Sequence, residues 1–292
     1  MKHCKGAALI LVMWLLVLLI GVISIFAINA RTEAMQGSHA RLQTQLLYAS
    51  QAGIEIAARR MLEIEPNRRL IADGRHTEFA FDQFEIQLSV RDESGKLDIN
   101  IVDANTLRNF WMALGISAER AQLMSAAMID WRDPDDLLQP EGGAEEAEYR
   151  AADKPYGCKN GPYESVAELQ RVLGIEEEDL RAAMPYLTVY TGLAQANPAF
   201  ADEAVLRAMG YPPEIVNKIM ESRRSWQPGM PMPNIPGIPT LAANGTGTYS
   251  ISSRASRADG PSLAIQAIIR VGSGSYLGQF YTPLAWEIGE QE

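Results

Sequence analysis

The sequence predicts an α+β fold in which a long N-terminal helix packs on an antiparallel sheet, with a large α-helical domain inserted between the strands. Three observations predict it. An uncharged apolar run over residues 7–30 continues into an amphipathic helical pattern. Residues with the alternation of strands fall into two groups, before residue 102 and after residue 247. The long stretch between these groups has helical periodicity.

Composition and charge narrow the functional classes. The chain has 292 residues, 47% of them apolar, so a folded protein of about two domains is expected. Acidic residues outnumber basic ones 36 to 26, which argues against binding to nucleic acid, since phosphate neutralisation needs Lys and Arg. Three His and two Cys leave little material for a His- or Cys-rich metal site or a disulfide framework.

The apolar run is long enough to cross a membrane. Residues 7–30 span roughly 36 Å as a helix, against about 30 Å of bilayer core. Lys2 and Lys5 precede the run, which favours a cytoplasmic N-terminus and export of everything that follows. A secretory signal peptide would be shorter and would end in a small-residue cleavage site. A plain signal anchor therefore stays open at this point.

The helical pattern does not stop at residue 30. No proline interrupts it until Pro66, so one helix is predicted from residue 7 to about residue 64. Its second half is amphipathic. Apolar or small residues recur there at spacings of three, four and seven on one face: Met35, Leu42, Leu46, Ala49, Gly53, Ile56, Ala57 and Met61.

Strands are expected on both sides of the helical stretch. Residues 78–91 alternate, with one slip near Asp82 that indicates a bulge, and residues 97–101 form a second strand of the same hairpin. Three further strands are predicted near the C-terminus: residues 249–258, 263–271 and 276–288. Periodicity leaves two arrangements open. One sheet with a helical insertion is the economical one, and two domains in series is the alternative.

Three similar segments lie within the helical stretch. Each reads as helix, glycine turn, helix, with the turn at Gly115, Gly174 or Gly210. This shape is similar to the helix-hairpin-helix motif of DNA-binding proteins, so a DNA-binding periplasmic protein is one alternative. The residues after the turns are acidic or proline-rich and no second glycine follows, which disfavours phosphate binding.

An acidic loop over residues 130–153 follows the first of these segments. The loop contains nine acidic residues and only two basic ones, Arg132 and Arg150. A solvated loop and a calcium site both account for it, because Ca²⁺ takes six to eight oxygen ligands. The loop is not an EF-hand, since the twelfth position counted from Asp133 is Ala144.

No catalytic constellation is found, so the chain is not expected to be an enzyme. It has no G-x-S-x-G, phosphate-binding loop or C-x-x-C motif. A membrane-anchored periplasmic enzyme that uses the acidic pairs is the remaining catalytic alternative.

The N-terminus resembles that of type IV pilins and type II secretion pseudopilins. In that family a prepilin peptidase cuts after a glycine and the new amine is methylated, which here implies processing between Gly6 and Ala7. Most such subunits carry a glutamate at the fifth mature position, where this chain has Leu11. A subunit without that acid lacks the pairing made inside the fibre, which suits the fibre tip. The K class of type II secretion typically lacks it.

The acidic loop and its surroundings resemble the K class more specifically. The shared pattern is Asp-Trp, Asp-x-Asp, Gly-Ala-Glu-Asp/Glu with a following Tyr, an Asn, and Ser-x-x-Glu-Leu. In this chain the matching residues are Asp130-Trp131, Asp133, Asp135, Gly143-Ala144-Glu145-Glu146, Tyr149, Asn160 and Ser165 to Leu169. The family's inserted domain binds calcium, and by pattern the resemblance implies Asp133, Asp135, Glu145 and Glu146 as ligands.

The resemblance also implies a domain organisation and a function. The expected segments are a leader (1–6), a transmembrane half-helix (7–30), a pilin-like domain in two parts (31–102 and 247–292), an inserted helical domain (103–226) and a proline-rich linker (227–246). The implied function is that of a minor pseudopilin at the tip of the type II secretion pseudopilus, anchored once in the bacterial inner membrane with its bulk in the periplasm. Partners would be the I and J minor subunits, the major pseudopilin and prepilin peptidase. A minor pilin of a related type IV pilus is a further alternative.

Overall fold

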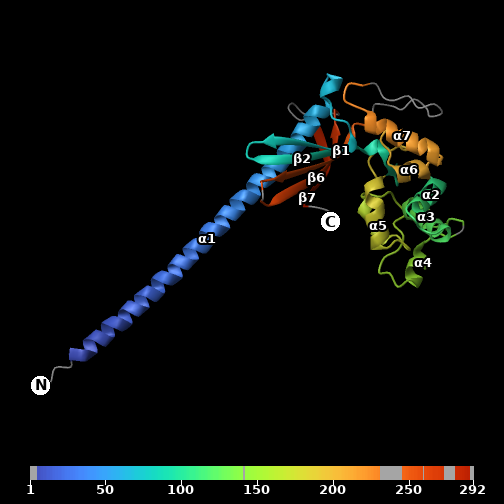
Figure 1. The fold of residues 1–292 in the computed structure, drawn as a ribbon. Coiled ribbons are helices and arrows are strands. Elements are labelled where there is room, and N and C mark those ends of the chain that lie inside the picture. Colours follow the sequence, from blue (N-terminus) through green and yellow to red (C-terminus); the bar gives the residue numbers. More distant parts are fainter. Residues whose placement is uncertain (1–4, 141, 231–244, 259, 273–279, 290–292) are drawn as a thin grey trace.

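One long helix, α1 (Lys5–Met61), runs out from a body of sheet and helices (Figure 1). The computed structural model describes residues 5–140, 142–230, 245–258, 260–272 and 280–289. Within these residues α1 is the helix that is long and apolar enough to cross a membrane. Its first half is exposed all round, and its second half lies against the sheet.

The main sheet has five antiparallel strands in the order β1-β2-β5-β6-β7. Strand β2 pairs directly with β5, with Glu85 opposite Ser256 and Asp92 opposite Tyr249. The two groups of strands predicted from sequence therefore belong to one sheet, and two domains in series is wrong. The strands are β1 (Asp73–Phe81), β2 (Phe84–Asp92), β5 (Thr248–Ser256), β6 (Ser262–Val271) and β7 (Tyr281–Ile288).

Helix α1 covers the middle of this sheet. It packs on β2, β5 and β6, as the amphipathic pattern requires. The helix and the sheet approach closely at Gly53, because a Cβ at this position would overlap the Ser253 hydroxyl on β5. The buried residues of the interface include Leu46, Ala49, Ile54, Ala57 and Ala58 from the helix and Ile86, Leu88, Ile251, Ile265 and Ile269 from the sheet.

Two details of the first strands differ from the expectation. The slip near Asp82 is a tight turn between two separate strands, with Asp82 at φ 54°, and not a bulge within one strand. The expected second strand shrinks to β3 (Leu97–Asp98), which pairs in parallel with β4 (Leu187–Thr188) and not with β2. Asp98 ends β3 early, because its carboxylate accepts the N–H groups of Asn100, Thr191 and Gly192.

The helices between β2 and β5 form the inserted domain (Figure 1). The three predicted glycine turns are present, with positive φ at Gly115, Gly174 and Gly210. The second repeat begins with a 3₁₀ segment, η3 (Val166–Arg171), where the other two begin with α-helices. The helices are α2 (Ala104–Ala113), α3 (Ala118–Arg132), α4 (Glu146–Ala151), α5 (Glu177–Ala183), α6 (Glu203–Ala208) and α7 (Pro213–Ser225). Three further 3₁₀ segments are η1 (Pro66–Arg68), η2 (Glu93–Gly95) and η4 (Met184–Tyr186).

The insert has its own hydrophobic core. Phe110, Trp111, Met124, Met128 and Tyr149 are fully buried in it. Buried polar contacts connect this domain to the sheet. The carboxylate of Glu93, in η2, pairs with Lys96 at 2.5 Å and accepts hydrogen bonds from Thr188 on β4 and Ser250 on β5.

The predicted fold class is confirmed: a long N-terminal helix packs on an antiparallel sheet, and an α-helical domain is inserted between its strands. The exact domain borders stay predictions. Most of the predicted linker 227–246, and residues 1–4 of the predicted leader, lie outside the described residues.

Candidate metal centre

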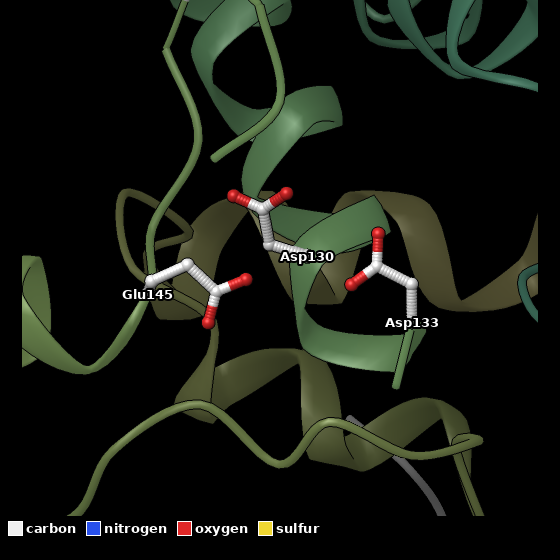
Figure 2. A group of neighbouring side chains, drawn as sticks. All are labelled: Asp130, Asp133 and Glu145. Atoms are coloured by element: carbon white, nitrogen blue, oxygen red, sulfur yellow. The ribbon is translucent and has the colours of Figure 1, made fainter. Parts of the chain in front are cut away.

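Three carboxylates meet at the end of α3. Asp130, Asp133 and Glu145 each offer an oxygen, and these oxygens lie within 4.8 Å of one another. Figure 2 shows the three side chains as neighbours, two from the end of α3 and one from the loop that precedes α4. Oxygen ligands at this density are the kind that Ca²⁺ prefers.

Helical geometry places the first two carboxylates. Asp130 lies in the last turn of α3 and Asp133 follows its last residue, so the spacing of three brings them to one side. Between them, Arg132 points the other way and donates to the carbonyls of Ile99 and Val102, at 2.5 and 2.6 Å. The Arg132 guanidinium thereby fixes the end of α3 against the start of the insert.

Asp130 folds the acidic loop back onto the helix. Its two oxygens accept the backbone N–H groups of Gln139 at 3.1 Å and Ala144 at 2.7 Å. Gly143 lies against the same carboxylate, and a Cβ there would overlap it. The loop therefore needs glycine at this position, and the fold-back brings Glu145 to the cluster.

Glu145 is the least satisfied member of the group. Its side chain is 5% exposed, and both of its carboxylate oxygens are buried without a hydrogen-bond partner. One oxygen of Asp133 is buried in the same way, while the other accepts from the Gln139 amide at 3.3 Å. Buried carboxylate oxygens without donors are costly, and a bound cation would satisfy them.

The electrostatics of the cluster agree with its geometry. Burial raises the pKa of Glu145 to about 7, with further contributions from the negative charges of Asp130 and Asp133. Burial also raises the pKa of Asp130 and of Asp133 above the usual range of a carboxyl group. Each carboxylate thus resists ionisation in the absence of a positive charge.

The structure brings together only part of the sequence-predicted ligand set. Asp133 and Glu145 are in the cluster, whereas Asp135 accepts the backbone N–H of Leu137 at 2.9 Å. Glu146 forms an exposed ion pair with Arg150 on α4, at 2.9 Å. Asp130, which the resemblance leaves out of the ligand set, contributes an oxygen to the cluster.

A second segment packs over the loop. The Asn160 amide donates to Asp136 at 2.8 Å, and its own oxygen is buried without a partner. Trp131, next to Asp130 in the chain, contacts Tyr149 with the two rings tilted and their centroids 5.8 Å apart. The matched Asn and Tyr positions of the sequence pattern thus contact the acidic loop at Asp136 and the end of α3 at Trp131.

The processing positions lie at the other end of the molecule. Gly6 and Ala7 fall in the first turn of α1, and Leu11 follows one turn later with 69% of its surface exposed. The structure gives their place on the helix, and their predicted roles remain predictions.

Comparisons with known proteins show which family this chain resembles. Residues 89–192 match the model described as type II secretion system (T2SS), protein K. The resemblance to the protein K family is confirmed. The matched region begins in β2 and contains the whole carboxylate cluster and the turns at Gly115 and Gly174.

Two curated protein K sequences show how far the likeness extends. The type II secretion system protein K of Pseudomonas aeruginosa is 28% identical over 137 residues, which cover 44% of this chain and 41% of that protein. The protein K of Pectobacterium carotovorum is 25% identical over 206 residues, covering 63% and 62%. The matches thus span less than two thirds of either relative.

A solved structure shares the fold. It is the GspK-GspI-GspJ complex of the enterotoxigenic Escherichia coli type 2 secretion system, and one of its chains is matched over its whole length and over 88% of this chain. The TM-score is 0.61 at 17% identity. This K-family neighbour agrees with the long helix, antiparallel sheet and inserted helices described above.

Proposed function

We propose that this chain is a minor pseudopilin at the tip of a type II secretion pseudopilus, where it helps to start the fibre and to export folded proteins across the outer membrane. The observation that carries the proposal is the protein K match over residues 89–192, which falls on the inserted domain and includes its carboxylate cluster. The apolar half of α1 supports it, because a fibre subunit of this class is assembled from the membrane.

The proposed anchor has one orientation. The N-terminus lies in the cytoplasm, because Lys2 and Lys5 precede the apolar run, and the sheet and insert lie in the periplasm. Prepilin peptidase then cuts between Gly6 and Ala7, and the new amine is methylated. The mature chain keeps the whole apolar segment as a single membrane span.

Placement at the tip follows from two features. Leu11 stands where other subunits carry the acid that pairs with a neighbouring subunit in the fibre. Without that pairing, this chain does not need a further subunit above it. The inserted domain adds bulk at the end of the molecule far from the apolar half of α1 (Figure 1), where it hinders stacking of another subunit. The proposed partners are the I and J minor subunits and the major pseudopilin. The solved neighbour is a GspK-GspI-GspJ complex, which supports the first two.

We further propose that the cluster binds calcium. The donor set fits the ion: three carboxylates converge, and three of their oxygens are buried without partners. Asp130, Asp133 and Glu145 would hold it. The ion would supply positive charge that joins the end of α3 to the loop before α4, so its role is structural. The resemblance also implies Asp135 and Glu146 as ligands. Substitutions at these two residues are therefore the comparison for substitutions in the cluster.

Two measurements test the proposed function. The intact mass of the membrane-extracted protein, made with and without prepilin peptidase, should show loss of residues 1–6 and gain of a methyl group only with the enzyme. Co-expression with the I and J subunits of the same secretion system should give a complex that co-purifies. A full-length chain in both mass samples, together with no complex, would reduce the protein to a signal-anchored domain of another function.

A further inference from the structure

A basic hollow lies at the C-terminal end of α1. Its volume is about 440 Å³, and it is formed where the loop after α1 meets the start of β1 and the chain that leaves α7. Four of its ten lining residues are arginines, although the chain as a whole is acidic. They are Arg60, Arg68, Arg69 and Arg75.

The four arginine charges in the hollow are only partly balanced, although Glu63 also lines it. Arg75 is held by Asp73 at 2.7 Å, and Arg68 pairs with Glu65 at 2.9 Å. Arg60 and Arg69 form no ion pair with any residue that the structure describes. Arg60 lies over the ring of Phe79, 5.9 Å from its centroid, and Arg69 donates only its Nε, to the backbone carbonyl of Glu63. Two guanidinium groups therefore keep terminal N–H donors for a ligand.

The backbone that carries these arginines is fixed. The N–H of Arg68 donates to the carbonyl of Glu65 at 3.0 Å, which closes the 3₁₀ turn η1. Arg75 donates to the carbonyls of Trp226 and Arg223, at 3.1 and 3.2 Å, so the chain leaving α7 is tied to the start of β1. A hollow with a preformed frame binds a ligand at lower entropic cost than a mobile loop does.

The lining indicates the ligand's chemistry. Arginine forks bind carboxylate and phosphate groups, and both are anionic. Leu70, Ile71 and Pro228 add an apolar surface beside the arginines, which suits a peptide that carries acidic side chains. Lipid headgroups of the membrane that holds α1 are out of reach. Residue 61 is 31 residues past the apolar run, or roughly 46 Å along the helix.

We propose that this arginine-lined hollow docks an acidic peptide segment of a partner protein through Arg60 and Arg69. This site is separate from the carboxylate cluster, and it does not depend on calcium or on the position of the chain in a fibre. It adds a binding surface where the sheet meets the inserted domain.

The test uses the full-length protein in detergent micelles and a fluorescein-labelled hexaglutamate peptide as the probe. Anisotropy should show saturable binding that weakens as ionic strength rises. The double variant Arg60→Gln/Arg69→Gln should raise Kd roughly tenfold or more, because two charged donors are lost. Hexaglutamine should not bind.

A matched control separates the hollow from net charge. Arg181→Gln/Arg207→Gln removes the same two charges from exposed helical ion pairs of the insert, with Glu177 and Glu203. This variant should bind the probe like the parent. An equal loss of affinity in both double variants, or no saturable binding to the parent, would overturn the proposal. Inorganic phosphate that binds the parent while the peptide does not would replace it with a phosphate site.

Discussion

Asp130 and Ala144 are joined by a hydrogen bond of 2.7 Å, from the backbone N–H of Ala144 to the carboxylate of Asp130. The bond crosses 14 residues of sequence and closes the acidic loop on the end of α3. Glu145 is the next residue, so its carboxylate lies beside Asp130 and Asp133. Neither of its oxygens accepts a hydrogen bond from a residue that the structure describes. The loop thus brings three carboxylates together, and a bound cation or protonation of Glu145 relieves their mutual repulsion.

Calcium should raise the melting temperature of the purified full-length protein in detergent. At a calcium concentration about 100 times Kd, linkage predicts a gain of about 2.7 kcal/mol in unfolding free energy. Asp133→Ala with Glu145→Ala should abolish the gain, whereas Asp135→Ala with Glu146→Ala should retain it, because these two residues lie outside the cluster. A parent protein whose melting temperature ignores calcium would contradict the metal proposal.

Calcium binding should also depend on pH. Burial and the charges of Asp130 and Asp133 raise the pKa of Glu145 to about 7 in the folded protein. A carboxyl in the unfolded chain ionises near pH 4.3, so the stability that this group contributes without metal is present below that pH and is lost as pH rises through about 7. Calcium requires the ionised form, and its affinity should therefore fall as pH drops below 7.

The measurement for this pH dependence is isothermal titration calorimetry in two buffers of different ionisation enthalpy. Near pH 6 the difference in heat should correspond to about one proton released per calcium bound, and the release should vanish well above pH 7. Glu145→Gln should remove the proton release. If the parent releases no proton at either pH, Glu145 is not a ligand of the ion.

Gly143→Ala should destabilise the loop. The added methyl group would overlap the Asp130 carboxylate, and we expect a cost of about 1–3 kcal/mol in unfolding free energy and weaker calcium binding. Gly161→Ala is the control, because the nearest atom to a Cβ there is 3.8 Å away. Chemical denaturation of both variants would check this pair, and equal stabilities would show that Asp130 does not hold the loop as described.

The parts of the fold that were predictable rest on local signals. The three helix turns carry glycines, and Gly115, Gly174 and Gly210 all take the positive φ that such turns need. The hairpin between β1 and β2 was missed because its turn residue is Asp82, which adopts φ 54° without a glycine to mark it. The short β3 was missed because the carboxylate of Asp98 is captured by backbone donors 93 and 94 residues away, at Thr191 and Gly192.

The carboxylate cluster shows the same limit. The sequence pattern identified Asp133 and Glu145, which the structure brings together with Asp130. It chose Asp135 and left Asp130 out of the ligand set, since both lie close to Asp133 along the chain and the sequence alone does not show which one faces it. The end of α3 makes the difference. Asp133 directly follows the last residue of α3, three positions after Asp130, and stays beside it, while Asp135 accepts from the backbone of Leu137.

Gly53→Ala should weaken the packing of α1 on the sheet. A Cβ at Gly53 would overlap the Ser253 hydroxyl and lie 3.1 Å from Ile86, so a loss of about 1–3 kcal/mol is expected. Gly37→Ala, in the same helix with no atom within 4 Å of its Cβ position, should cause no loss. Thermal unfolding of the two variants measures the difference. Equal midpoints would show that the sheet yields at this contact.

Leu11→Glu should change the place of the subunit without changing its fold. Position 11 is exposed on the apolar half of α1, so the substitution disturbs no packing in the monomer. Under the tip proposal, the restored acid permits positions within the fibre. Immunogold labelling of assembled fibres should then show label along their length, where the parent is labelled at ends. A variant found only at the ends would show that Leu11 does not set the position.

The pairing of β2 with β5 also constrains how the chain folds. Glu85 and Ser256 face each other across the sheet although they are 171 residues apart in sequence. During synthesis α1 and the first hairpin emerge early, yet the middle of the sheet cannot close until β5 has been made. Until then Ile54 and Ala58 have only the hairpin to pack against. Folding of the inserted domain shortens the effective loop to be closed, so we expect it to promote completion of the sheet.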